Sequence, residues 1–296
     1  MTGSVRGAVF MCLAMLGFGI EDALFKAATQ HASPGMATLV FGLVALALSI
    51  LWARYSGIPA WSAEYLRRRL LIRTAFELVG RLFFALSLAF VPLATTSAIL
   101  QAAPLMVTLG AALVLGEKVG PRRWAATGAG FIGVLLILRP GAEGFQPTVI
   151  FAVLGMIGFA GRDLATRTSP PGVHAAQLGV LGFAVVTAAG IVILLAEGAR
   201  PTMPPAPAWP WMIGTALVGV VAYAALTQAM RSGTVSVVAP FRYFRLIVAL
   251  VIAYAAFGER PDGWMLAGAA LIVVSGLYTL LRDTRARRAA GAGAGP

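Results

Sequence analysis

Residues 94–116 read ATTSAILQAAPLMVTLGAALVLG and are followed by Glu117 and Lys118. The segment 234–257 is also apolar and continues into Gly258-Glu259-Arg260, at an offset of 142 residues from Gly116-Glu117-Lys118. Each segment is long enough for a helix to cross a hydrocarbon core of about 30 Å. Two such copies predict a membrane protein built from a repeated helical unit.

The composition supports a membrane protein. Of the 296 residues, 59% are hydrophobic and 11% are charged, and the mean hydropathy is +0.86, whereas soluble domains carry about 25% charged residues. These proportions exclude a soluble globular protein, a disordered chain and a fibrous repeat. The net charge of +12 is better explained by basic cytoplasmic loops than by nucleic acid binding.

Apolar runs interrupted by charged residues, prolines or glycines predict ten transmembrane helices, because continuous helix satisfies the backbone in lipid. The first run has no convincing cleavage site, so we interpret it as a retained helix rather than a signal peptide. The single cysteine, Cys12, excludes an internal disulfide. The predicted helices cover residues 7–27, 35–53, 72–91, 94–116, 123–139, 148–166, 174–196, 209–230, 234–257 and 262–281.

The loop charges predict the orientation. Sixteen of the 23 lysines and arginines fall at one set of alternate loops and ends, and four fall on the opposite side. Basic residues favour the cytoplasmic face. We therefore expect a multi-pass protein of the inner (plasma) membrane with both termini in the cytoplasm.

The two halves of the chain resemble each other. Met15-Leu-Gly-Phe18 matches Met156-Ile-Gly-Phe159 at an offset of 141. Five crossings separate equivalent points, and five is odd, so the two copies are expected to lie inverted in the membrane, as in many secondary transporters. The predicted units are a first repeat over 1–144, a second repeat over 145–284 and a disordered basic cytoplasmic tail over 285–296.

Two stretches, Pro92 to Gly141 and Ser236 to Arg282, each contain an apolar helix, Gly-Glu-Lys/Arg, a short turn, a tryptophan and a Gly/Ala-rich final helix. In these features the chain resembles the EamA family of the drug/metabolite transporter superfamily. The resemblance implies an inner-membrane carrier of small metabolites, often amino acids, that works by alternating access. It implies neither a substrate nor a direction.

Motifs for other chemistry are weak. Gly128-Ala-Gly130-Phe-Ile-Gly133 matches the dinucleotide fingerprint, but it lies inside a predicted transmembrane helix with no preceding strand. We interpret these glycines, with Gly268 and Gly276 in the second half, as sites of close helix packing. The sequence offers no convincing catalytic set, metal ligand set or Walker motif, so we expect no enzyme activity, no metal, no cofactor and no nucleotide partner.

Charges inside the predicted helices are the strongest indicators of a site, since an ionised group in hydrocarbon costs at least about 2.5–3.5 kcal/mol. Arg81, Arg242 and Arg245 align with uncharged residues of the other half, so a symmetric scaffold does not require them. Guanidinium groups suit planar oxyanions, and Arg81 with Arg242 or Arg245 is expected to hold a carboxylate or phosphate. The predicted substrate-binding residues are Arg81, Glu77, Arg242, Arg245, Tyr243, Gln101, Tyr223 and Glu21.

Two explanations of these residues stay open. In the first, Glu77 and Glu21 neutralise the arginines or contact a substrate ammonium, while the tyrosines and Gln101 orient the substrate. In the second, Glu77–Arg81 and related pairs are purely structural. The sequence does not choose between them.

Two further pairs repeat in both halves at i,i+4 spacing. Asp22 with Lys26 and Asp163 with Arg167 are expected to form ion pairs that act as gates or as structural links. The family-motif residues Glu117 and Glu259 are expected at helix ends or turns rather than at substrate.

The sequence therefore favours a secondary transporter of an amino acid or another carboxylate-bearing metabolite, with export inferred from family analogy alone. One alternative is uptake or exchange of a larger metabolite, such as a vitamin or a nucleoside-like cofactor. An alternative of another class is an intramembrane enzyme or a non-transporting scaffold. Proton coupling and oligomeric state are not predicted.

Overall fold

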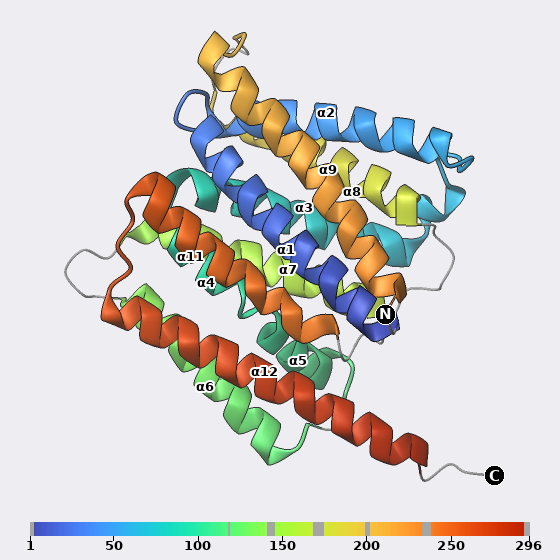
Figure 1. The fold of residues 1–296 in the computed structure, drawn as a ribbon, viewed down its shortest axis with the longest axis vertical. Helices are drawn as coiled ribbons and strands as arrows, with labels where there is room; N and C mark the ends of the chain where they lie inside the picture. Colours follow the sequence, from blue (N-terminus) through green and yellow to red (C-terminus); the bar gives the residue numbers. More distant parts are fainter. Residues whose placement is uncertain are drawn as a thin grey trace.

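The computed structural model describes residues 3–117, 119–140, 146–167, 175–198, 202–232 and 238–292. Every regular element in these ranges is helical (Figure 1). In chain order they are α1 (Gly3–Ala28), α2 (Pro34–Tyr55), η1 (Ala63–Leu66), α3 (Arg68–Phe90), α4 (Leu93–Leu100), α5 (Ala103–Val114), α6 (Pro121–Leu138), η2 (Pro147–Val149), α7 (Ile150–Arg167), α8 (Ala175–Ala196), η3 (Ala206–Ala208), α9 (Trp209–Ser232), η4 (Ala239–Tyr243), α11 (Phe244–Phe257) and α12 (Gly263–Ala292).

Eight segments of the described chain are long and apolar enough to cross a membrane. Four of them combine two helical elements: α4 with α5 over Leu93–Val114, η2 with α7 over Pro147–Thr166, η3 with α9 over Ala206–Met230 and η4 with α11 over Ala239–Phe257. The predicted crossings in α3 and α6 are not among the eight. The reason lies in their charge, because α3 carries four arginines and a glutamate, and α6 begins with Pro121 and two arginines.

The predicted bounds agree with the structure to within a few residues except at three places. The helix expected over 94–116 is interrupted between Leu100 and Ala103, because Pro104 has no N–H to continue the hydrogen-bond ladder. The helix expected over 234–257 begins outside the described residues, and its described part opens with a 3₁₀ turn that contains Pro240. Helix α12 continues to Ala292, so the backbone of residues 285–292 in the expected tail is helical.

Both copies of the family motif form the same turn. Gly116 and Gly258 have φ angles of +67° and +64°, a region that glycine enters without steric cost. The next residue folds back in each case. The N–H of Glu117 donates to the Ala111 carbonyl at 3.1 Å, and the N–H of Glu259 donates to the Ala253 carbonyl at 2.9 Å. The expected position of these glutamates at a helix end is therefore confirmed.

The helices pack in four main pairs: α1 with α9, α2 with α8, α3 with α7 and α6 with α12. Exchanging the two halves leaves this pattern unchanged, because α1 corresponds to α7 and α3 corresponds to α9. Figure 1 shows α6 and α12 running together along one edge of the bundle. The start of α1 and the end of α12 lie toward the same end of the bundle (Figure 1).

Glycines set the distance between paired helices. A Cβ at Gly42 of α2 would lie 2.5 Å from the backbone nitrogen of Thr187 in α8, and one at Gly190 of α8 would lie 2.4 Å from that of Leu39. As the residue number rises in α2 it falls in α8, so these two equivalent helices are antiparallel. Helices α6 and α12 also approach closely, because a Cβ at Gly133 would lie 2.7 Å from the carbonyl oxygen of Gly268.

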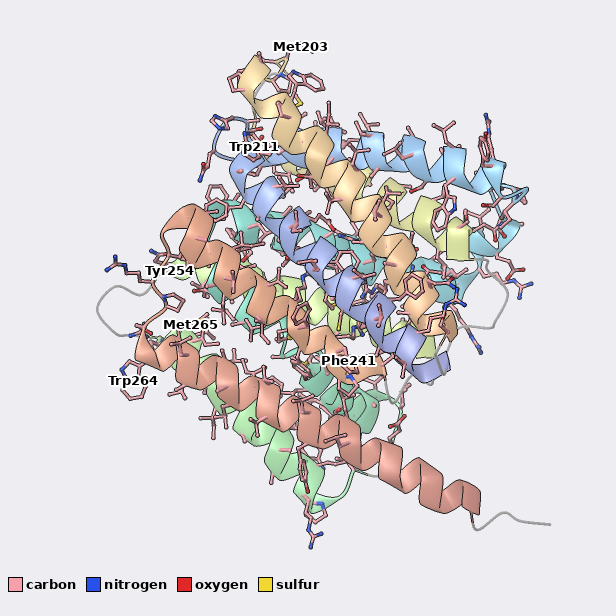
Figure 2. The ribbon with its side chains drawn as sticks, in the orientation of Figure 1. Met203, Trp211, Phe241, Tyr254, Trp264 and Met265 are labelled. Carbon is pink, nitrogen blue, oxygen red and sulfur yellow. The ribbon has the colours of Figure 1, made fainter. Side chains whose placement is uncertain are left out.

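Large aromatic side chains mark one end of the bundle. Trp211 at the start of α9, Tyr254 near the end of α11 and Trp264 at the start of α12 are 39%, 64% and 59% exposed. In Figure 2 all three lie toward the end at which α1 finishes. Tryptophan and tyrosine are enriched at the interface between membrane and water, so this distribution is typical of a membrane boundary.

Candidate functional site

In the described part of the chain, eight charged side chains gather in the interior of the bundle. The most deeply buried are Asp22, Glu77, Glu21 and Arg73, with 2%, 3%, 6% and 8% exposure. Buried charges are stable only when they are paired or hydrogen-bonded. The members of this cluster are Glu21 and Asp22 on α1, Arg73, Glu77 and Arg81 on α3, Arg162 and Asp163 on α7, and Arg245 on α11.

Arg245 is committed to Asp22. Its Nη2 lies 2.7 Å from both carboxylate oxygens, and its Nε donates to Oδ2 at 3.0 Å. The guanidinium carbon lies 5.3 Å and 5.5 Å from the ring centres of Phe18 and Phe84. Arg245, expected as a substrate ligand, therefore joins α11 to α1 and is already neutralised.

Glu77 links α3 to α7. Its carboxylate lies 2.9 Å from Arg73 Nη1 and 3.6 Å from Arg162 Nη1. Arg162 also donates to Asp163 Oδ1 at 2.8 Å, and Arg73 donates to Thr166 at 3.2 Å. The expected partner of Glu77, Arg81, is not among these contacts.

Two members of the cluster, Arg73 and Arg162, are not among the residues that the sequence predicted for the site. Both lie near the cytoplasmic end of a predicted helix, 72–91 or 148–166, where basic residues are expected as topology signals. Arg162 lies on α7. Its side chain is only 20% exposed and lies 5.1 Å over the ring of Phe159. The repeat offset of 141 aligns Arg162 with Glu21. That alignment was the signal that would have identified it.

Glu21 and Arg81 line one cavity and have no ion-pair partner in the described part of the chain. Their buried atoms Oε2 and Nε also lack a hydrogen-bond partner there. The cavity volume is about 30 Å³, which is room for roughly two water molecules. The lining residues are Glu21, Asp22, Phe25, Thr38, Phe41, Arg81, Phe84, Ala85, Leu88 and Val186.

Aromatic rings surround this cavity. Phe41 contacts Phe25 and Phe183 edge to face, with ring centres 6.4 and 6.0 Å apart. The Phe183 ring centre is also 6.0 Å from that of Tyr223. Tyr223, which was predicted to orient substrate, thus belongs to the aromatic shell behind the cavity rather than to its lining.

The remaining predicted ligands lie elsewhere. Gln101 Nε2 donates to the Arg242 carbonyl at 3.2 Å, so the two interrupted helices meet at that point. The Arg242 side chain is exposed. Tyr243 is buried against α12, where a Cβ at Gly276 would lie 1.7 Å from its hydroxyl oxygen. The structure therefore does not bring Arg242 and Tyr243 into the lining of the cavity.

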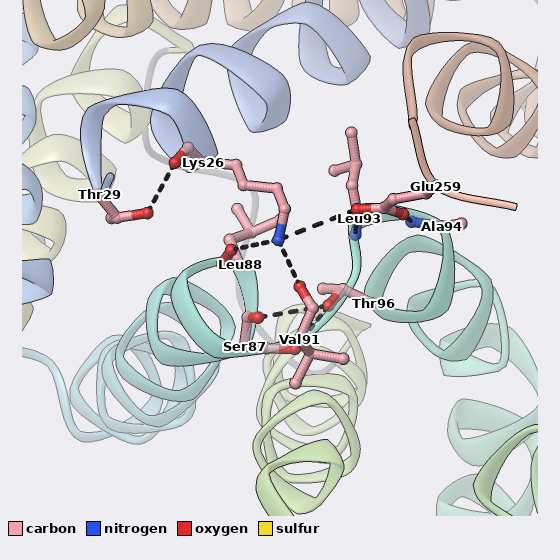
Figure 3. A network of polar contacts seen from close by, with 9 residues as sticks. All are labelled: Lys26, Thr29, Ser87, Leu88, Val91, Leu93, Ala94, Thr96 and Glu259. Carbon is pink, nitrogen blue, oxygen red and sulfur yellow. Dashed lines mark hydrogen bonds and ion pairs between the residues drawn. The ribbon is translucent and has the colours of Figure 1, made fainter. Parts of the chain in front are cut away.

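Lys26 does not pair with Asp22 as expected. Its Nζ donates to the carbonyls of Leu88 at 3.2 Å and Val91 at 2.7 Å, and it lies 4.0 Å from Glu259 Oε1 (Figure 3). Asp22 is occupied by Arg245, which the sequence places 223 residues away. The i,i+4 spacing alone did not identify the partner.

Glu259 completes the same network. Its two carboxylate oxygens accept hydrogen bonds from the backbone N–H groups of Leu93 at 2.7 Å and Ala94 at 3.0 Å (Figure 3). It therefore caps the first turn of α4, where N–H groups have no partner within the helix. The network ties the ends of α1 and α3 to the start of α4 and the turn after α11.

The second predicted pair is only partly described. Asp163 accepts from Arg162 Nε at 3.0 Å, and the side chain of Arg167 lies outside the described residues. The network around Lys26 shares Leu88 with the cavity lining, so the network adjoins the cavity at that residue.

A comparison with known protein families matches each half of the chain separately. The model of the EamA-like transporter family matches residues 5–139 and 146–281. A solved crystal structure superposes with a TM-score of 0.59 at 20% sequence identity, over 95% of this chain and 98% of that chain. At that identity the likeness concerns the fold.

Several curated proteins are similar to this chain. It is 28% identical to a riboflavin transporter of Rhizobium johnstonii, over 96% of this chain and 94% of that protein. It is 27% identical to an S-adenosylmethionine uptake transporter of Rickettsia bellii, over 73% of each. It is 25% identical to the pseudopaline exporter CntI of Pseudomonas aeruginosa, over 91% of this chain and 94% of that protein.

Proposed function

The chain belongs to the EamA-like transporter family, and we propose that it moves a small organic metabolite across the inner membrane by alternating access. The observation that carries the proposal is the cavity between α1, α2, α3 and α8, in which Glu21 and Arg81 have no described partner. Binding sites of this kind are mostly apolar with a few placed polar groups. The remaining charges of the cluster are paired and hold the helices together.

We propose ten crossings arranged as two inverted repeats. The antiparallel packing of the equivalent helices α2 and α8, and of α6 and α12, supports a two-fold relation between the halves. Helix α3 crosses as well in this proposal, because its inner charges Arg73, Glu77 and Arg81 point into the protein rather than into lipid. The loop charges favour cytoplasmic termini. The start of α1 and the end of α12 lie toward the same end of the bundle, which is consistent with this orientation (Figure 1).

The substrate that we favour is a vitamin or a nucleoside-like metabolite rather than an amino acid. The relatives named for riboflavin and S-adenosylmethionine support this alternative better than export of an amino acid or another carboxylate-bearing metabolite, which the sequence alone favours. Phe25, Phe41 and Phe84 around the cavity also suit a planar ring. A cavity of about 30 Å³ is too small for such a solute, so binding requires the halves to separate.

Flux into sealed proteoliposomes tests the proposal. Purified protein would be given riboflavin, S-adenosylmethionine, uridine and alanine in turn. We expect saturable movement of unchanged riboflavin or uridine that empty liposomes lack. Arg81→Gln should lower this flux at least tenfold, whereas the exposed Arg54→Gln should not. Flux of alanine alone would contradict the substrate class, and a chemically altered product would indicate an enzyme.

A further inference from the structure

The charge balance of the interior cluster restricts the solute. Four carboxylates face four guanidinium groups, so the eight residues sum to zero when all are ionised. Six of them form ion pairs in the described structure: Asp22 with Arg245, Glu77 with Arg73 and Arg162, and Asp163 with Arg162. The two that remain are Glu21 and Arg81, which both line the cavity.

We propose that Glu21 and Arg81 together recognise the edge of an uncharged planar ring that carries an N–H donor beside a carbonyl acceptor. This inference rests on the proposed function and specifies its substrate class. The Glu21 carboxylate accepts the ring N–H, and the Arg81 guanidinium donates to the carbonyl. A cyclic imide or lactam, as in a flavin or a pyrimidine, presents such an edge.

The burial of the two polar atoms supports this pairing. Glu21 is 6% exposed, and both Glu21 Oε2 and Arg81 Nε are without a described hydrogen-bond partner. An unmatched buried polar group is costly, more so when it is charged. A ring edge that matches both groups at once relieves that cost, whereas a carboxylate substrate satisfies Arg81 and repels Glu21.

With all eight groups ionised the cluster is neutral, and this balance argues against a charged solute. An anion would leave the buried site with one unbalanced negative charge, and a cation with one positive charge, in a region of low dielectric. S-Adenosylmethionine carries a sulfonium charge, so the inference places it below riboflavin and uridine as a substrate.

Glu21 is also specific to one half of the chain. The equivalent residue in the second half is Arg162, so repeat symmetry does not require an acid at this position. Gly219 of α9 leaves room for it, because a Cβ there would lie 3.1 Å from Glu21 Cδ and 3.3 Å from a ring carbon of Phe41. The lack of a side chain at Gly219 thus leaves space for the Glu21 carboxylate and the Phe41 ring.

Equilibrium binding to the purified full-length protein tests the inference. The probes are riboflavin, riboflavin methylated at the imide nitrogen, and uridine with its N3-methyl form. Methylation removes the donor and keeps the ring, so we expect binding to weaken about tenfold to a hundredfold, as for loss of a hydrogen bond to a charged group. Glu21→Gln should weaken riboflavin binding and leave the methylated form within about threefold.

A matched control is Glu64→Gln, since Glu64 pairs with Arg67 at the surface. It should leave all four affinities unchanged. Equal binding of the methylated and unmethylated probes, or an equal loss of both in Glu21→Gln, would overturn the inference. Transport of S-adenosylmethionine without binding of any of the four probes would overturn it too, while the proposed transport function would stand.

Discussion

Asp22 of α1 and Arg245 of α11 form a bidentate ion pair that joins the first half of the chain to the second, with Arg245 Nη2 2.7 Å from both carboxylate oxygens. Asp22 is 2% exposed. The geometry is the planar fork that guanidinium makes with carboxylate. An interaction so deeply buried fixes how α1 and α11 approach each other.

Breaking this pair should destabilise the protein strongly. Asp22→Asn leaves the guanidinium of Arg245 without its counter-charge, and loss of one partner of a buried pair costs about 3–5 kcal/mol. Asp22→Asn with Arg245→Gln removes both charges and should recover a large part of that loss. Thermal unfolding of the three proteins in detergent measures the difference. A double variant less stable than either single variant would contradict the assignment.

The network around Lys26 should hold the cavity closed at Leu88. Glu259→Ala removes the acceptor of two α4 N–H groups and the acid near Lys26, at an expected cost of about 1–2 kcal/mol. In a Cys12→Ala, Leu88→Cys background, the cysteine at the buried position 88 should react several-fold faster with a water-soluble maleimide when Glu259→Ala is present than when Glu259 is intact. The control is Arg260→Ala, because Arg260 is exposed and follows Glu259 directly in the chain. Equal labelling rates would remove the closing role.

How far the sequence predicts this site depends on the distance along the chain between partners. The repeat, the helix positions and the turn at Glu259 follow from local composition and spacing. The partner of Asp22 does not, because i,i+4 spacing pointed to Lys26 while the fold brings Arg245 from 223 residues away. Local spacing identifies which residues are charged inside the membrane. Only the packing of helices decides which of them meet.

The same limit applies to the interrupted helices. Pro104 and Pro240 were visible in the sequence, yet apolar runs around them favoured continuous crossings. The structure ends α4 at Leu100 and makes a 3₁₀ turn at Pro240. A hydropathy profile shows where an apolar run begins and ends. It does not show that a proline within the run lacks the backbone N–H that a continuous helix needs.

Glycines in this chain should differ sharply in their tolerance of alanine. A Cβ at Gly158 of α7 would lie 2.4 Å from the backbone nitrogen of Gly80 in α3, whereas one at Gly128 of α6 meets nothing within 4 Å. Gly158→Ala should therefore separate α3 from α7 and lower stability by about 1–3 kcal/mol. Gly128→Ala should be neutral or stabilise by about 0.5–1 kcal/mol, as alanine does in a helix.

Thermal unfolding of the two glycine variants measures this contrast. The result also bears on the Gly128-Ala-Gly130-Phe-Ile-Gly133 motif. Gly130 and Gly133 contact Leu105 and α12 at short range, so two of its three glycines serve helix packing. Equal destabilisation at 128 and 158 would contradict the packing explanation.

Asp262 should make stability depend on pH in the acid range. Its Oδ1 accepts the N–H of Met265 at 2.8 Å at the start of α12, and its side chain pairs with Arg139 at the end of α6. The hydrogen bond from Met265 and then the contact with Arg139 lower the pKa of the carboxyl below its ordinary value of 3.8. The ionised form is thus favoured in the folded protein.

A lowered pKa in the folded state means that the stabilisation is complete above the ordinary value and disappears as the pH falls through the lowered one. Asp262→Asn keeps a capping acceptor but loses the charge. We expect the free energy of unfolding of the wild type to exceed that of the variant by less than about 1 kcal/mol, because the pair is exposed. Thermal unfolding should show a constant difference in stability between the wild type and Asp262→Asn from pH 5 to 7, and this gap should close below pH 4. In 1 M salt the gap should shrink at every pH, because charges are then screened beyond about 3 Å. A gap that widens on acidification would contradict the assigned role of Asp262.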